Sequence, residues 1–356
     1  MRDLPFWVAL SKISSLGARR IMCLVEAFGS AEAAFTASFD DLTDAGLSAK
    51  AADVLLVERR AIDPDIALQG VKDAGFVVMT RQDRRYPTLL REIYDPPAVL
   101  YYRGESDVLN GHCIAIVGSR KATEYGKAAA ARLAGDLARA GTVVVSGMAR
   151  GIDTHAHAGA LRAEGKTVAV LGCGLDICYP PENVRLREKI VSQGIVLSEF
   201  PPGTKPKPHH FPMRNRIISG LSVATVVVEA AEKSGALITA DCALEQGREV
   251  FAVPGSINSP ASRGCHRLIK EGAAVAENGA DILAELGVFS DVPCISAPQM
   301  SSLQKRIIDA LQYEPIHFDN LCVRANLPAP DLAAVLVELE LAGIVKKMPG
   351  NYYLRV

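Results

Sequence analysis

One segment of the chain concentrates cations and aromatic rings while it carries no acidic side chain. Between residues 200 and 228 there is no Asp or Glu. The segment carries the cations Lys205, Lys207, Arg214 and Arg216, with His209, His210 and the aromatic ring of Phe211 beside them. Guanidinium groups bind phosphate oxygens through paired hydrogen bonds, and aromatic rings stack on nucleobases. The segment therefore predicts a polyanion site, although a solvated basic loop without a ligand could have the same composition.

Apolar segments rich in Val and Ile alternate with helix-length segments in the middle of the chain. The predicted strands are residues 113–117, 142–145, 167–171, 194–197, 223–228 and 249–253. The predicted helices are residues 125–140, 153–164, 183–193, 213–219 and 234–247. This alternation predicts an α/β fold with a doubly wound, mostly parallel sheet. A ligand of such a sheet lies at the carboxyl ends of the strands, and the basic segment follows the fourth strand.

Glycine-containing loops follow several of these strands. The first loop is Gly118-Ser119-Arg120, the second spans residues 146–153, and the fifth spans residues 229–239. Glycine allows backbone N–H groups to approach an anion, and helix N-termini favour negative charge. Since these loops share one edge of the sheet, we expect their cations to converge there. These cations are Arg120, Arg150, Arg214, Arg216 and Lys233.

Motifs for other ligands are missing from the sequence. No predicted strand is followed by Gly-x-Gly-x-x-Gly, and there is no P-loop, so we expect neither a dinucleotide nor ATP hydrolysis. Asp153 is predicted to cap a helix, and His155 and His157 lie two positions apart, on different helix faces, which does not suit a metal site. The eight cysteines form no Cys-x-x-Cys pair. We therefore predict no cofactor and no metal.

Composition restricts the class of protein. The 356 residues have a net charge of -1 and a hydrophobic content of 49%, so the chain can build two or three domains, and nucleic-acid binding requires a local patch. No window approaches the roughly 18 uninterrupted apolar residues of a membrane span, and the N-terminal residues lack a signal-peptide pattern. We expect a cytoplasmic protein with no membrane partner.

Seven motifs in order, between about residues 80 and 287, resemble the DNA processing protein A family (DprA, also called Smf). They are Gly118-Ser-Arg with Thr123-x-Tyr-Gly126, Ser146-Gly-x-Ala-x-Gly-Ile-Asp153, Tyr179-Pro, Glu199-Phe-Pro-Pro-Gly203, Phe211-Pro-x-Arg-Asn-Arg-Ile-Ile-Ser-Gly220, Ser234-Gly-x-Leu-Ile-Thr239 and Gly247-Arg-Glu-Val-Phe-Ala-Val-Pro-Gly255. The resemblance implies an extended Rossmann-like fold that binds single-stranded DNA and forms a homodimer. It also implies loading of the RecA recombinase onto incoming DNA during natural transformation, without catalysis.

The resemblance also implies which residues bind the strand. They are Gly118, Ser119, Arg120, Gly147, Arg150, Gly151, Lys207, His210, Phe211, Arg214, Asn215, Arg216, Lys233, Ser234 and Gly235. Arginine contacts to phosphates and stacking on an aromatic ring are independent of base sequence, as a protein that accepts any strand requires. One departure is Pro181, which stands where members often carry Lys or Arg after Tyr-Pro, and Arg185 could replace that contact.

The terminal regions differ from the centre of the chain. Residues 1–75 resemble a SAM-like helical domain with paired helix-hairpin-helix units, in which Ser15 and Ser48 replace hairpin glycines. Residues 76–290 are the predicted Rossmann-like domain and residues 291–300 a linker. Residues 301–356 show a winged-helix (DML1-like) pattern, with helices at 303–311, 318–325 and 331–341 before a hairpin. The third helix carries Asp331, Glu338 and Glu340 and no Lys or Arg, so we predict a protein-interaction or structural role for this domain.

Two other functions compete with strand binding. A nucleotide-processing enzyme of the LOG phosphoribohydrolase type has a related sheet and the signature Pro-Gly-Gly-x-Gly-Thr-x-x-Glu. The corresponding residues 231–239 lack the glycine pair and the final Glu. The other alternative is a regulator that binds duplex DNA through the winged helix.

Overall fold

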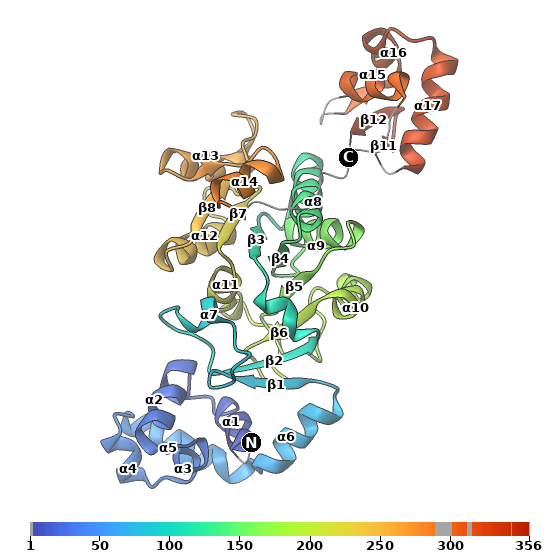
Figure 1. The fold of residues 1–356 in the computed structure, drawn as a ribbon. Coiled ribbons are helices and arrows are strands. Elements are labelled where there is room, and N and C mark those ends of the chain that lie inside the picture. The colour runs from blue at the N-terminus through green and yellow to red at the C-terminus, as the bar shows by residue number, and fades with distance from the viewer. Residues whose placement is uncertain (1–2, 289–300, 312–314, 343, 356) are drawn as a thin grey trace. The chain divides into compact units, whose positions relative to one another are not determined.

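The computed structural model describes residues 3–288, 301–311, 315–342 and 344–355 (Figure 1). They form two compact units, one of Met1–Ala122 with Ala129–Phe289, the other of Thr123–Ala128 with Ser290–Val356. The predicted linker at residues 291–300 lies outside the described residues. Within the described ranges, no helix has the length and apolar character needed to cross a membrane.

A nine-stranded sheet forms the centre of the larger unit, in the order β1-β2-β6-β5-β4-β3-β7-β8-β9. The strands are β1 (Val77–Thr80), β2 (Val99–Gly104), β3 (Cys113–Val117), β4 (Val143–Ser146), β5 (Thr167–Val170), β6 (Ile195–Ser198), β7 (Ala224–Val227), β8 (Glu249–Ala252) and β9 (Ala274–Val275). Strands β3 to β9 pair in parallel, whereas β1 and β2 add an antiparallel edge. The predicted doubly wound α/β sheet is confirmed.

Helices cover both faces of this sheet (Figure 1). They are α8 (Glu124–Arg139), α9 (Ile152–Arg162), α10 (Val184–Gln193), α11 (His210–Gly220), α12 (Gly235–Glu245), α13 (Arg263–Lys270) and α14 (Gly279–Glu285). The central strands are therefore buried on both faces, and all five residues of β3 are buried. The strand order reverses between β3 and β7. In a doubly wound sheet this reversal leaves a crevice at the carboxyl ends of the two strands.

The N-terminal helices share a hydrophobic core with the β1–β2–β6 side of the sheet. They are α1 (Leu4–Ser11), α2 (Ala18–Phe28), α3 (Ala31–Thr36), α4 (Phe39–Asp44), α5 (Ala49–Glu58) and α6 (Pro64–Asp73), and the short α7 (Thr88–Arg91) lies between β1 and β2 in sequence. Trp7 belongs to the same buried cluster as Tyr101 of β2 and Ile190 of α10. The hydroxyl groups of Ser11 and Tyr101 are hydrogen-bonded at 2.6 Å, so the helical region is anchored to the sheet edge.

The C-terminal residues form a small winged-helix fold, as predicted. Its helices are α15 (Ser302–Ala310), α16 (Phe318–Ala325) and α17 (Ala329–Leu341), and its strands β10 (Ile316–His317), β11 (Val345–Met348) and β12 (Tyr352–Arg355) pair in the order β10-β12-β11. Ile307, Leu321 and Leu336 contribute one residue from each helix to its core. The short strand β10 is an element that the sequence pattern did not predict.

Candidate nucleic-acid interface

A pocket of about 750 Å³ lies at the crevice between the carboxyl ends of β3 and β7. The predicted site residues that line it are Gly118, Ser119, Arg120, Lys207, Phe211, Arg214, Asn215, Ser234 and Gly235. Lys121, which was not predicted, also lines it and is exposed. Lys121 directly follows Arg120 in the first glycine loop, so its position in sequence could have indicated it.

Six predicted residues do not line this pocket. They are Gly147, Arg150, Gly151, His210, Arg216 and Lys233. Lys233 is exposed on the loop before α12, and Gly147 and Arg150 instead line a small adjoining recess. The expected convergence of the five arginine and lysine side chains is therefore only partial.

The first two glycine loops interlock beneath the pocket. The backbone N–H of Ile152 donates to the carbonyl of Ser119 at 3.2 Å. Gly151 has a φ of 76°, and a Cβ atom there would lie 2.8 Å from the carbonyl oxygen of Arg120. Because both the backbone angle and the close approach exclude a side chain, Gly151 allows its loop to pack directly against the Arg120 loop.

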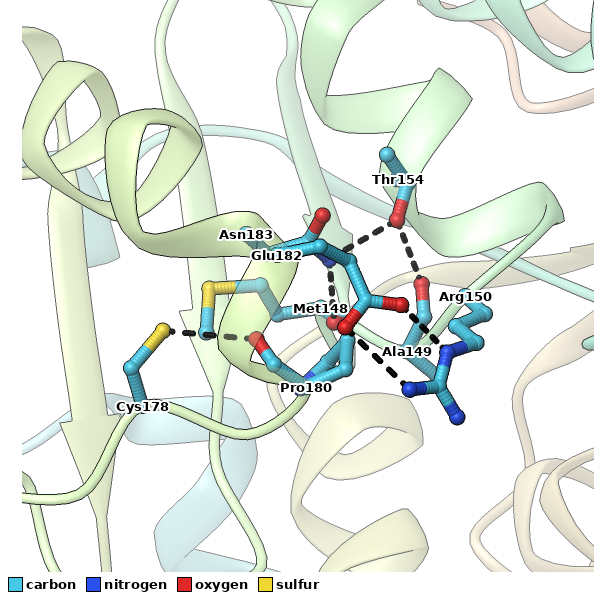
Figure 2. Close-up of polar contacts among 8 residues, drawn as sticks. All are labelled: Met148, Ala149, Arg150, Thr154, Cys178, Pro180, Glu182 and Asn183. Carbon is cyan, nitrogen blue, oxygen red and sulfur yellow. Dashed lines mark hydrogen bonds and ion pairs between the residues drawn. The ribbon is translucent and has the colours of Figure 1, made fainter.

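The loop from Gly147 to Gly151 is braced by the segment after Tyr179 (Figure 2). The Asn183 side-chain amide donates to the carbonyl of Met148 at 3.0 Å and to Thr154 Oγ1 at 2.9 Å. Met148 is buried and has a left-handed φ of 55°, a conformation that is uncommon for a residue with a side chain. Arg150 forms an ion pair with Glu182, which raises the pKa of Arg150 through hydrogen bonding. This cation is therefore already paired in the absence of a ligand.

Phe211 contacts a cation and a second aromatic ring at the pocket. The Arg120 guanidinium carbon lies 4.7 Å from the centroid of the Phe211 ring, and the Tyr179 ring lies at 5.5 Å with an interplanar angle of 36°. Gly172 allows the ring this position, since a Cβ there would lie 3.0 Å from Phe211 Cδ1. Arg120 is exposed, so its flat guanidinium group offers both charge and a stacking surface.

Arg214 lines the pocket, but its side chain is almost fully buried and its guanidinium group is hydrogen-bonded to backbone carbonyls. It is only 3% exposed, and its Nη1 donates to the carbonyl of Gly147 at 2.7 Å and to the carbonyl of Val170. Burial lowers the pKa of Arg214 to about 10, and the nearby Asp153 carboxylate opposes that shift. The guanidinium group therefore stays charged at neutral pH and links α11 to the ends of β4 and β5.

Arg216 is committed to carboxylates from other parts of the chain. It forms ion pairs with Glu199, at the end of β6, and with Asp95, where Nε lies 3.4 Å from Oδ2. Burial raises the pKa of Glu199, and the Arg216 charge opposes this effect. The pair joins the start of the basic segment to α11, so Arg216 holds the segment in place instead of facing the pocket.

His210 is also directed inward. Its side chain is buried and stacks on Phe200 with 4.2 Å between ring centroids. Burial lowers the pKa of His210, and the neighbouring His209 adds to that effect. A neutral imidazole is expected at neutral pH, so His210 does not supply the positive charge that its place in the basic segment suggested.

Asp153 has a different structural role from the one predicted. The N-cap of α9 is Gly151, and Asp153 lies in the first turn, where Oδ2 accepts from the backbone N–H groups of Gly147 and Ala149 at 3.2 Å each. His155 Nδ1 contacts the carbonyl of Gly151 at 2.9 Å, whereas His157 is buried and its Nδ1 lies 2.7 Å from Thr167 Oγ1. The two histidines have separate partners, and the described part of the chain holds no His, Cys, Asp and Glu cluster suited to a metal.

The fold and the pocket define an extended Rossmann-like protein with a ligand crevice at its switch point and an appended winged-helix unit. The model of the family described as DNA recombination-mediator protein A matches residues 77–287, and the DprA winged helix domain model matches residues 295–351. The chain belongs to the DNA recombination-mediator protein A (DprA/Smf) family.

Relatives with names from this family cover most of the chain. It is 35% identical to Protein Smf of Synechocystis over 98% of both chains, and 47% identical to DNA processing protein DprA of Bacillus subtilis over 62% of this chain and 74% of that one. The crystal structure of DNA processing protein A from Streptococcus pneumoniae has 39% identity and a TM-score of 0.70 over 79% of this chain and 96% of that one. Another structure, described for its single-stranded DNA binding mode, is DNA processing protein A from Helicobacter pylori, with 30% identity and a TM-score of 0.54 over 59% of this chain and 95% of that one.

Proposed function

We propose that this protein binds single-stranded DNA in the pocket between α11, α12 and the first glycine loop, in the cytoplasm. The observation that carries the proposal is the exposed Arg120 guanidinium stacked on Phe211 at the mouth of a 750 Å³ pocket that Lys121 and Lys207 also line. Flat cations and aromatic rings accept any base, and the lysines supply charge for the phosphates. The single-strand binding described for the Helicobacter pylori relative supports the same ligand class.

The test is fluorescence anisotropy with labelled single-stranded and duplex oligonucleotides at two salt concentrations. We expect preference for the single strand, weakened by salt, and a loss of about tenfold or more in Arg120→Ala, because both a phosphate contact and a stacking surface are removed. Lys189→Gln, an exposed charge change on α10, is the matched control. Equal or stronger duplex binding that does not depend on Arg120 would contradict the proposal and favour the winged helix.

The proposed downstream step is loading of the RecA recombinase onto the bound strand during natural transformation. The family's description as a recombination mediator supports this step. RecA hydrolyses ATP when it assembles on a single strand, so its activity on a strand already covered by a single-strand-binding protein reports loading. The wild type should accelerate that activity, and Arg120→Ala should not. A wild type that binds the strand without accelerating RecA would refute this step.

We also propose that two copies associate through the Rossmann-like part. Ile238 and Leu244 of α12 and Val275 of β9 are exposed, and β9 is an edge strand. Apolar side chains beside an open strand edge are features that a second copy can cover. Sedimentation equilibrium should give a dimer mass for the wild type and a smaller mass for Leu244→Glu. A monomeric wild type at micromolar concentration would argue against this interface.

We propose that the protein binds single-stranded DNA without catalytic activity. Asp153 is the one carboxylate among the described residues that line the pocket, and its Oδ2 already accepts two backbone N–H groups. A phosphoribohydrolase requires a carboxylate that can act on its substrate. Incubation with nucleoside monophosphates should therefore release no free base, and release that disappears in Asp153→Asn would restore the enzyme hypothesis.

A further inference from the structure

A second basic surface lies where the N-terminal helices meet the segment between β1 and β2. Tyr94 is 82% exposed, and the Arg19 guanidinium carbon lies 5.0 Å from the centroid of its ring. Arg19 also donates a hydrogen bond to the Tyr94 hydroxyl. At the other end of α2, Glu26 lies 4.0 Å from Arg81. These two contacts hold α2 alongside residues 81–94.

Positive charge dominates this surface. Residues 81–94 contain four arginines and two acidic residues, and α2 contains two arginines and one acidic residue. Each acidic residue has an arginine partner: Asp83 pairs with Arg85, Glu92 with Arg248, and Glu26 with Arg81. Within the described part of the chain, no carboxylate lies within ion-pair distance of the remaining arginines, and the hydrogen bonds of Arg20 and Arg91 to the carbonyls of Ser15 and Asp83 leave their charge without a carboxylate partner. With Tyr94 they form what is called here the arginine–tyrosine surface, made of Arg19, Arg20, Arg84, Arg91 and Tyr94.

Helix α11 connects this surface to the pocket. Phe211 lies at the pocket, and Arg216, five residues further along α11, forms an ion pair with Asp95, which directly follows Tyr94. The last turn of α11 also packs on α7, because a Cβ at Gly220 would lie 2.9 Å from Leu90 Cδ1. At about 1.5 Å per helical residue plus the reach of the ion pair, Tyr94 lies on the order of 15 Å from the pocket. That distance equals about four or five nucleotides of a stacked strand at ~3.4 Å each.

We infer that the arginine–tyrosine surface is a second contact site for the single strand that occupies the pocket, with Tyr94 and Arg19 as a stacking surface and Arg20, Arg84 and Arg91 facing phosphates. The inference rests on the proposed strand binding and extends it. An exposed aromatic ring among arginines that lack carboxylate partners is the chemistry by which single-stranded nucleic acid is held without regard to sequence. The surface therefore lengthens the site beyond the pocket and engages only strands long enough to reach it.

The experiment compares oligothymidines of two lengths, because a strand of about four nucleotides fills the pocket alone and one of about 20 nucleotides reaches both sites. The variants are Tyr94→Ala and the pair Arg19→Gln with Arg84→Gln. The control is Lys189→Gln on α10, an exposed charge change at a residue that belongs neither to the pocket lining nor to the arginine–tyrosine surface. Binding is measured by anisotropy over a range of salt concentrations, and thermal unfolding verifies that each variant is folded.

Both variants should bind the long strand about tenfold more weakly and the short strand as the wild type does. The arginine pair should also reduce the salt slope by roughly 0.7, the value for the one phosphate contact assigned to Arg84. Long-strand affinity unchanged within about twofold, or an equal loss for both lengths, overturns the inference. If the wild type binds neither length, the proposed function itself fails, and that result is distinct from failure of the second site alone.

Discussion

Arg214 distinguishes a structural cation from a ligand-binding one, and its replacement by alanine has a predictable cost. The side chain donates to the carbonyls of Gly147 and Val170, and its positive charge stabilises the buried Asp153 carboxylate. Each hydrogen bond from a charged donor contributes roughly 1.5–3 kcal/mol, and removing one member of a buried charged pair costs about 3–5 kcal/mol. Since these contributions overlap, we expect Arg214→Ala to lower the free energy of unfolding by about 4 kcal/mol. For a unit of this size that corresponds to a melting temperature lower by about 10 °C.

The assay is thermal unfolding by circular dichroism together with oligonucleotide anisotropy at a temperature where the variant is folded. Arg120→Ala is the matched comparison because Arg120 is exposed and lies above the same pocket. It should melt within about 1 °C of the wild type while losing affinity, as expected for a surface substitution. The reasoning is refuted if Arg214→Ala also melts like the wild type but binds the strand weakly. That outcome would return Arg214 to the role of a direct phosphate contact.

Two further predictions concern the support beneath the pocket. In Gly147→Ala the new Cβ would lie 2.6 Å from Arg214 Cζ, so we expect a loss of about 1–3 kcal/mol from overpacking; urea unfolding checks this, and an unchanged midpoint would contradict the tight packing. Burial lowers the pKa of His157 from 6.5 to about 3, so the unfolded chain binds the extra proton first and stability falls as pH decreases from 6.5 toward 3. At pH 5 the loss is about 2 kcal/mol. Between pH 7 and pH 5 the free energy of unfolding should therefore fall by about 2 kcal/mol more in the wild type than in His157→Asn. An equal pH dependence in the two proteins would exclude His157 as the cause.

Strands β3 to β8 could be predicted from the sequence because nearly all of their residues are buried. Residues 113–117 were predicted as a strand and match β3, and the other five predicted strands agree with β4 to β8 within one or two residues. Strands β1 and β2 were not predicted. Strand β2 pairs with β1 and also with β6, which lies more than 90 residues further along the chain, and this second, long-range antiparallel pairing leaves no local pattern. Strand β9 has only two residues, too few for a periodic signal.

The location of the candidate site could be predicted, but the roles of its arginines could not. The basic segment has no acidic residue of its own, so its arginines were expected to be available to a ligand. These arginines and the neighbouring Arg150 interact with carboxylates that lie outside residues 200–228. The carboxylates are those of Asp95, Asp153, Glu182 and Glu199. Only the fold brings them close, and charge counted along a sequence does not show charge balance in space.

Helical periodicity nevertheless separates the two arginines of α11 once one residue of the helix is assigned to the pocket. Successive residues turn by about 100°, so Asn215 and Ile218 share the face of Phe211, and all three line the pocket. Arg214 lies about 60° from Phe211 around the helix and reaches the floor of the pocket, whereas Arg216 lies about 140° away and meets Asp95 and Glu199. An Arg-Asn-Arg sequence in a helix therefore cannot direct both cations to one ligand. Among the residues that line the pocket, Arg120, Lys121 and Lys207 are the exposed cations that can meet a phosphate, and the two inward arginines fix the surface from which these three act.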